Sequence, residues 1–242
     1  MNKYILGDTI MPTLKKEMDL VDYPVPEEVR VMEGEHPAFG KVFQRTSRYK
    51  ADKIKRISEV RHDVGGTLVG TVILIMCEDN YDFPFIMANI AFAPGEGGKD
   101  KMFVEINYMP FIKDEESTRK YIDPLRGWRE AIDKIPSEPI SGLGGEPGEF
   151  IRDSISPFQY LRFVPVDYLD QVIDLTKQFF EIFLDFWRKA EPIKDIQRRE
   201  KIAAFRREYN RHILEEDPSG RASIEAFGKE KALLSFENTV FL

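Results

Sequence analysis

The chain has 242 residues, of which 42% are hydrophobic, which is enough for one large domain with a substantial core. Its net charge of -7 argues against general nucleic-acid binding, which requires a basic surface. The longest apolar run, residues 71–76, is far shorter than the roughly 20 residues of a membrane span, and the first residues lack the apolar core of a secretion signal. We therefore expect a cytoplasmic monomer, with a single domain over residues 1–242, that binds neither nucleic acid nor membranes.

The N-terminal segment differs from the rest of the chain. Residues 1–35 are rich in charge and proline, and a short amphipathic helix is predicted near residues 11–20. We interpret residues 1–35 as a peripheral N-terminal arm.

A strand-like pattern begins at about residue 40. The predicted strands cover residues 41–48, 53–64, 68–76, 83–92 and 102–109. The second is the least regular, because Ile54, Ile57 and Val60 recur every three residues, as in a helix. A turn at Gly65-Gly66 and a loop through residues 94–98 each join two consecutive strands, so an antiparallel meander is the simplest arrangement.

Helices dominate the second half. The predicted elements are a helix over 114–134 interrupted near Pro124, a strand at 158–164, a helix at 168–190, a helix from Pro192 to about 215 and two short helices after Asp217. In the helix that Pro192 opens, the predicted inward positions are Ile196, Ala203, Phe205, Tyr209 and Ile213. Strands in the middle and helices at the end predict an α/β fold, a three-layer α/β/α sandwich with a central antiparallel sheet flanked by helices.

Two glycine-rich segments resemble phosphate-binding loops without the required context. No strand precedes residues 142–148, and Pro147 and Pro157 prevent a long helix after them. Residues 95–100 lack the spacing and the hydroxyl residue of a Walker motif. We expect ordinary loops in both places and no ATP binding.

Neither a disulfide nor a metal site is expected. Cys77 is the one cysteine, and it ends an apolar run, which suggests a small strand residue and not a nucleophile. The three histidines, His36, His62 and His212, are too far apart in sequence for a local metal motif.

The break at Asp217 is the clearest candidate for chemistry. Pro218 restricts the residue before it and favours the first turn of a new helix, so Asp217 is predicted as an N-cap. The carboxylate either only caps the amides of Gly220 and Arg221 or also carries acid chemistry. The local sequence is compatible with both.

Several short segments occur in an order that is typical of one family. They are Tyr81-Asp82-Phe83-Pro84, Asn89, Ile155-Ser156-Pro157-Phe158, Tyr209, and Asp217-Pro218-Ser219-Gly220-Arg221 with Phe227-Gly228. In this order, over roughly residues 40–242, they resemble the ferredoxin-dependent bilin reductases. The resemblance implies that a linear tetrapyrrole, biliverdin or a related bilin, lies between the central sheet and the C-terminal helices.

The resemblance also implies two residues that face this pigment from opposite sides. Asp217 would donate protons, and Asn89 would orient the pyrrole rings through its amide, which forms hydrogen bonds but cannot donate a proton at ordinary pH. Many members of the family have an aspartate at the position of Asn89. An asparagine that only satisfies hydrogen bonds at a strand edge is the alternative.

Some members of the family also use a histidine and a glutamate on the preceding strand. Here the position of the histidine falls on Thr71 or Val72. The position of the glutamate falls on or near Glu59, which becomes a candidate second acid, with Asp63 as its competitor. The alternative for both carboxylates is a solvated charge on a strand.

The propionate groups of a bilin require cations or hydrogen-bond donors at the mouth of the pocket. Arg152, just before the Ser156-Pro157 segment, is the candidate. Arg221 either holds the other propionate or closes a salt bridge at its helix start. Tyr209 either lines the pocket or fills the core.

The electron donor implied by the resemblance is reduced ferredoxin, an acidic [2Fe-2S] protein, so no bound cofactor is expected. Single electrons would alternate with protons through radical intermediates. Two basic clusters could dock such a partner if they converge: residues 48, 50, 53, 55 and 56, and residues 198, 199, 201, 206, 207 and 211.

Two other functions fit the same residues. One is a reductase that acts on a chlorophyll-derived bilin. The other is a tetrapyrrole-binding protein without catalysis, which would be consistent with the amide of Asn89 and the missing histidine.

Overall fold

A computed structural model describes residues 1–95, 100–140, 145–156 and 158–242. The predicted loops at 94–98 and 142–148 fall in part outside the described residues. Within the described residues, no helix combines the length and the apolar character of a membrane span.

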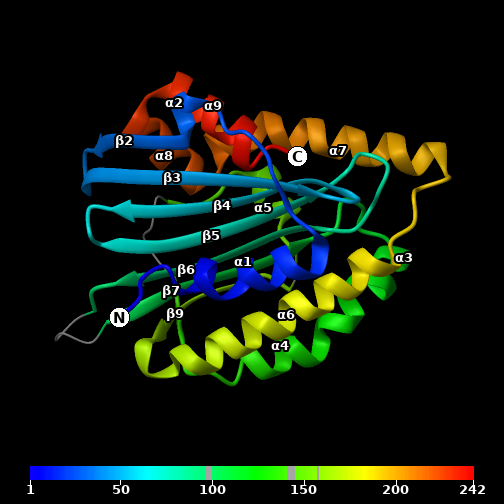
Figure 1. The fold of residues 1–242 in the computed structure, drawn as a ribbon, viewed down its shortest axis with the longest axis horizontal. Helices are drawn as coiled ribbons and strands as arrows, with labels where there is room; N and C mark the ends of the chain where they lie inside the picture. Colours follow the sequence, from blue (N-terminus) through cyan, green and yellow to red (C-terminus); the bar gives the residue numbers. More distant parts are fainter. Residues whose placement is uncertain (96–99, 141–144, 157) are drawn as a thin grey trace.

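One antiparallel sheet runs through the middle of the molecule (Figure 1). Its described strands are β1 (Val21–Asp22), β2 (Val31–His36), β3 (Gly40–Ala51), β4 (Ile54–Val64), β5 (Leu68–Cys77), β6 (Phe85–Ala93), β7 (Lys101–Met109), β8 (Glu138–Pro139) and β9 (Tyr160–Pro165). The order is β1-β3-β4-β5-β6-β7-β9-β8, and β2 pairs with β3. Because β3 to β7 are neighbours in chain order, the predicted meander is confirmed.

The structure of strand β4 shows why its apolar residues have a helix-like spacing. Its pairing register with β5 shifts between Ile54 and Arg56, so an extra residue separates Ile54 from Ile57. Both faces of the strand are also covered, and the polar side chains of Arg56 and Ser58 are buried beside carbonyl groups of the C-terminal segment. A strand that is buried on both faces does not alternate cleanly between apolar and polar residues.

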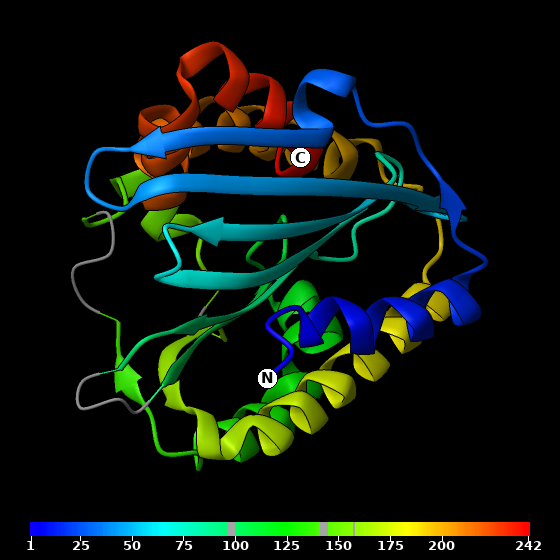
Figure 2. The same cartoon turned by 60° about the vertical axis from the view of Figure 1, so that its left-hand side comes forward.

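Helices cover both faces of the sheet, as Figures 1 and 2 show. One face carries α1 (Ile5–Met18), α4 (Arg126–Ile132) and α6 (Leu169–Lys189). The other face, which we call the C-terminal face, carries α5 (Glu149–Ser154), α7 (Ile196–Glu216), α8 (Pro218–Phe227) and α9 (Lys229–Thr239). The shortest helices are α2 (Glu27–Arg30) and α3 (Glu115–Ser117). The predicted three-layer sandwich is confirmed.

The region around Pro124 is broken, as expected. After α3, a wide turn over Thr118–Ile122 and a tight turn over Asp123–Leu125 lead into α4. Proline has no N–H for a helical hydrogen bond, which accounts for the interruption.

The interpretation of residues 1–35 as a peripheral arm is wrong for α1. Leu6, Ile10 and Leu14 are at most 2% exposed and belong to the core beneath the sheet. The helix begins earlier than predicted, and Pro12 lies inside it. The apolar stripe at positions 6, 10 and 14 has the four-residue spacing of a buried helix face.

Helix α7, in contrast to α1, begins later than predicted. Asp195 caps it by accepting hydrogen bonds from the amides of Gln197 at 2.8 Å and Arg198 at 3.3 Å, so Pro192 lies before the helix. Ile196 is 62% exposed, and Ala203 is exposed as well. The predictions of Tyr209 and Ile213 as inward positions are confirmed, and the buried face of the helix also includes Ile202, Arg206 and Leu214.

Candidate active site

The C-terminal face of the sheet carries a histidine next to Asn89. On β4, the hydroxyl of Ser58 points to the carbonyl of Thr239 on the C-terminal face, and His62 has the same parity along the strand. The Nε2 atom of His62 lies 3.4 Å from Oδ1 of Asn89 on β6. The two side chains meet across β5 because Gly70, the residue opposite His62, has no side chain between them.

Glu105 lies beside Asn89 on the same face. It is directly opposite Asn89 in the pairing of β6 with β7, and opposite residues in an antiparallel pair share a face. Its Oε1 accepts a hydrogen bond of 3.0 Å from Nε2 of Gln159, just before β9. The sheet therefore presents an imidazole, an amide and a carboxyl group in one row.

Asp217 approaches this row from the helical layer. It ends α7 and caps α8, and Oδ1 accepts hydrogen bonds from the amide of Ser219 at 2.8 Å and from the Ser219 hydroxyl. The predicted N-cap is confirmed, although the capped amide is that of Ser219 and not of Gly220 or Arg221. Pro218 opens α8, as the sequence predicted.

Tyr209 lies two helical turns before Asp217 on the buried face of α7. It is 6% exposed, and its ring packs against Phe85 at 6.3 Å and Phe205 at 6.2 Å between centroids. Phe85 belongs to β6, so Tyr209 joins the helical layer to the strand that carries Asn89.

The electrostatics of these groups are coupled. Burial, followed by the negative charge of Asp217, raises the pKa of Glu105 to about 8, while the hydrogen bond from Gln159 opposes this shift. Burial and then the charges of Asp217 and Glu105 raise the pKa of Tyr209. Burial lowers the pKa of His62. We call His62, Asn89, Glu105, Tyr209 and Asp217 the polar cluster.

Glu59 lies on the opposite face of the sheet, so the structure does not bring it into the polar cluster. Its Oε1 accepts a hydrogen bond of 2.9 Å from Nε of Arg61, and Arg61 also binds Asp8 of α1 at 2.7 Å. A Cβ on Gly7 of α1 would come within 2.6 Å of Oε1 of Glu59. The expectation of a second acid at Glu59 is corrected, because a shift of one residue along a strand reverses the face.

Asp63 was the alternative second acid, and Thr71 or Val72 occupies the position at which other family members have a histidine. Asp63 accepts a hydrogen bond of 2.7 Å from the amide of Gly66 and serves the β4–β5 turn. Thr71 is opposite Arg61, while Val72 is opposite Asn89. The polar cluster contains a histidine, but it is His62 on β4, whereas the family resemblance pointed to a position on β5.

The two candidate arginines differ in their surroundings. Arg221 donates hydrogen bonds to the carbonyl oxygens of Glu216 at 2.8 Å and Glu146 at 2.9 Å, and so ties the segment before α5 to the end of α7. Arg152 is exposed on α5. Its guanidinium group forms no ion pair with the part of the chain that the structure describes.

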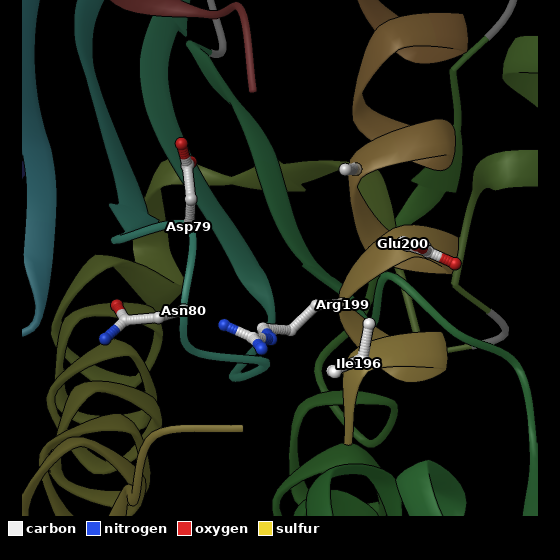
Figure 3. Close-up of a pocket in the computed structure, with 6 residues that line it drawn as sticks. Asp79, Asn80, Ile196, Arg199 and Glu200 are labelled. Atoms are coloured by element: carbon white, nitrogen blue, oxygen red, sulfur yellow. The ribbon is translucent and has the colours of Figure 1, made fainter. Parts of the chain in front are cut away.

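Two open hollows lie on the surface away from the polar cluster. One, of about 380 Å³, lies between the end of β5 and the start of α7 (Figure 3). Its lining residues are Asp79, Asn80, Ile196, Arg199, Glu200 and Ala203. The other, of about 650 Å³, lies between α1 and α6. Neither hollow is lined by a residue of the polar cluster.

The polar cluster is suited to proton transfer. It contains two carboxyl groups, one of which favours its neutral form at neutral pH, beside groups that can form hydrogen bonds. Among the described residues, no three His, Cys, Asp or Glu side chains are grouped so that they could hold a metal ion.

Sequence reasoning missed Glu105 and His62. Side chains alternate between the two faces along a strand, so His62, four residues after Ser58, could have been placed on the same face as Ser58. The position of Glu105 opposite Asn89 depends on a cross-strand register that the sequence alone does not give.

Comparisons with known proteins agree with one another. Residues 7–241 match the sequence model of a family described as ferredoxin-dependent bilin reductase. Phycoerythrobilin:ferredoxin oxidoreductase of Nostoc punctiforme is 24% identical over 229 residues, which make up 92% of this chain and 86% of that protein. The crystal structure of phytochromobilin synthase from tomato in complex with biliverdin has the same fold, with a TM-score of 0.70 and 14% identity over 95% of this chain and 78% of that chain.

Proposed function

This chain belongs to the ferredoxin-dependent bilin reductase family, and on that basis we propose that it reduces biliverdin or a closely related linear tetrapyrrole. The observation that supports this proposal is the polar cluster, in which the charge of Asp217 from the helical layer acts on Glu105, the residue opposite Asn89 on the sheet. The biliverdin bound to the tomato synthase, which has the same fold, supports this class of substrate.

Asp217 is the proposed proton donor. Ser219 holds Oδ1 at the start of α8, which leaves Oδ2 for a ligand. Protonation gives the pigment a positive charge, and a cation accepts an electron at lower energy than the neutral molecule. Electrons from reduced ferredoxin would then alternate with protons through radical intermediates, so we expect no flavin, nicotinamide or metal to be bound by the protein itself.

Asn89, Tyr209 and Arg152 are proposed to hold the pigment. The Oδ1 atom of Asn89 faces His62, so its N–H groups remain for a lactam oxygen or another acceptor of the substrate. Tyr209 lines the helical side. Arg152, exposed and without an ion pair to the described residues, is suited to a propionate.

The two basic clusters of the sequence meet at Asp79, which supports docking of ferredoxin nearby. Asp79 binds Lys55 at 3.1 Å and also Arg206. Some of the predicted docking cations are structural, because Arg56 and Arg206 are buried. The exposed cations of α7 remain, and Arg199 lines the adjacent hollow in Figure 3.

Turnover with ferredoxin tests the proposal. The protein is mixed with biliverdin, and then ferredoxin, its reductase and NADPH are added while absorption is recorded and products are separated by chromatography. We expect a spectral shift on binding and conversion after the reductant is added. A shift without conversion would favour a tetrapyrrole-binding protein, which the amide of Asn89 would suit.

Substitution of Asp217 tests its role. Asp217→Asn should bind biliverdin with a Kd within about threefold of the wild type but reduce it about 100-fold more slowly, with accumulation of a radical detectable by electron paramagnetic resonance. Asp195→Asn is the matched control, because Asp195 caps α7 in the same way. Undiminished product formation by Asp217→Asn would remove Asp217 from the mechanism.

A further inference from the structure

Reduction of a bilin double bond requires two protons, and the polar cluster contains two carboxyl groups. Asp217 accounts for one of them. Asn89 cannot supply the other, because an amide is not an acid at ordinary pH. Glu59, on the other face of the sheet, is engaged by Arg61.

Glu105 has the geometry of a proton donor. Gln159 holds Oε1, and the structure describes no hydrogen bond from a protein group to Oε2. Glu105 has an intermediate exposed fraction, although burial removes most of the hydration of its carboxyl group. Its side chain lies on the face of the sheet that α7 and α8 cover (Figure 1).

The groups that face Glu105 favour its protonated form. Charge repulsion by the carboxyl group of Asp217 raises the pKa of Glu105, and Tyr209 is neutral because its pKa is raised. His62, on the far side of Asn89, is neutral because burial lowers its pKa. With a pKa of about 8, Glu105 itself holds its proton at neutral pH.

We propose that Glu105 is the second proton donor to the bilin, acting from the sheet while Asp217 acts from the helical layer; this proposal rests on the proposed function. In each two-electron reduction, one C=C bond of the pigment becomes a C–C bond with two new C–H bonds. Two reduced ferredoxins are oxidised and supply one electron each. The O–H bonds of Glu105 and Asp217 break to supply the two protons, and water reprotonates both carboxylates.

Turnover of Glu105→Gln tests this assignment. The substitution keeps the shape and the acceptor for Gln159 but removes the acid. We expect a biliverdin Kd within about threefold of the wild type, reduction slower by about 100-fold or more, and a one-electron radical that persists. Glu138→Gln is the matched control, because Glu138 is exposed at the sheet edge and pairs only with Lys101 among the described residues. Wild-type turnover by Glu105→Gln would overturn the proposal.

A second measurement needs no substrate. Infrared difference spectra of the free protein between pH 6 and pH 10 should show a protonated carboxyl band that disappears near pH 8, present in Glu138→Gln and absent in Glu105→Gln. If the wild type converts no bilin, the proposed function fails, and this band still decides whether Glu105 is an acid at neutral pH. Its absence from the wild type would overturn the inference.

A third variant serves if Glu105→Gln does not fold. The hydrogen bond from Gln159 lowers the pKa of Glu105, so Gln159→Leu should raise it. The alkaline limb of the pH profile of bilin reduction should move to higher pH, by about one unit, which a merely structural role of Gln159 would not cause. An unmoved alkaline limb would contradict the assignment.

Discussion

Glu59 and Glu105 are both carried by inner strands of the sheet, but they lie on opposite faces. Glu59 meets the guanidinium group of Arg61 at 2.9 Å. Glu105 meets the neutral amide of Gln159 at 3.0 Å and the negative charge of Asp217. A neighbouring cation favours an ionised carboxylate and a neighbouring anion favours a neutral one, so the two glutamates are suited to different tasks.

The raised pKa of Glu105 predicts a pH-dependent stability. Its pKa is about 8 in the folded protein and near the ordinary value of 4.5 when unfolded. Between these values the folded state keeps a proton that the unfolded state releases, so the free energy of unfolding falls as pH rises. The glutamine of Glu105→Gln does not titrate, so its free energy of unfolding should not fall in this way. The free energy of unfolding of Glu105→Gln minus that of the wild type should therefore rise by about 2–4 kcal/mol from pH 5 to pH 8.

Urea unfolding of both proteins at a series of pH values measures this difference. Titrations of other groups are common to both proteins and cancel in the comparison. Glu138→Gln, in an exposed ion pair, should show no such trend. A difference between wild type and Glu105→Gln that does not change with pH would show that Glu105 has an ordinary pKa.

At the scale of whole elements, much of the fold was predictable. The strands from β3 to β7, apart from β4, carry strand-like local patterns, and α6 carries a clear apolar stripe. The two-residue strands β1 and β8 were not predicted, because they exist only through pairing with distant partners, and β2, which forms a hairpin with β3, was missed because residues 1–35 were taken for an arm. The burial of α1 was missed because charged residues flank its apolar stripe and the segment was taken for an arm.

The candidate site was predictable where its signal is local. Pro218 identifies the helix break, and the N-cap at Asp217 follows from it. Glu105 and His62 lack such a signal, because they approach Asn89 through the registers of three strand pairs. Glu59 was misplaced for the same reason, since sequence position alone does not fix the face of a strand.

The layered arrangement predicts what a change at Glu59 does. Glu59→Gln should lower the free energy of unfolding by about 1–3 kcal/mol, because it weakens a buried ion pair with Arg61 beneath α1. It should leave the rate of bilin reduction within about twofold of the wild type, because the polar cluster is on the other side of the sheet. Urea unfolding and the ferredoxin assay measure the two effects. A large loss of turnover in a folded Glu59→Gln protein would contradict this assignment of faces.

At the scale of the whole molecule, the net charge of -7 conceals an uneven distribution. Helix α7 exposes Arg199, Lys201 and Arg207, while Arg198 and Arg206 are engaged by carboxylates beneath it. An acidic partner would meet the exposed cations, and its approach would depend on ionic strength.

Charge reversal tests this surface. The double substitution Arg199→Glu with Lys201→Glu should raise the KM for ferredoxin about tenfold and weaken its dependence on salt, while the Kd for biliverdin stays the same. Lys16→Glu, an exposed cation on α1 across the molecule, is the control. An unchanged KM for ferredoxin in the double variant would place the docking surface elsewhere.

The tryptophans of this protein are both on the side of the sheet away from the polar cluster. Trp128 of α4 donates a hydrogen bond to the carbonyl of Leu175, and Trp187 of α6 donates one to the carbonyl of Asp52. A pigment in the polar cluster would be separated from both indoles by the strands, so it could dim their fluorescence by energy transfer but not by touching them. The emission wavelength of the two tryptophans therefore reports on the environment of the helices α1, α4 and α6 that surround them. The intensity of their emission reports whether a pigment is bound on the other side of the sheet.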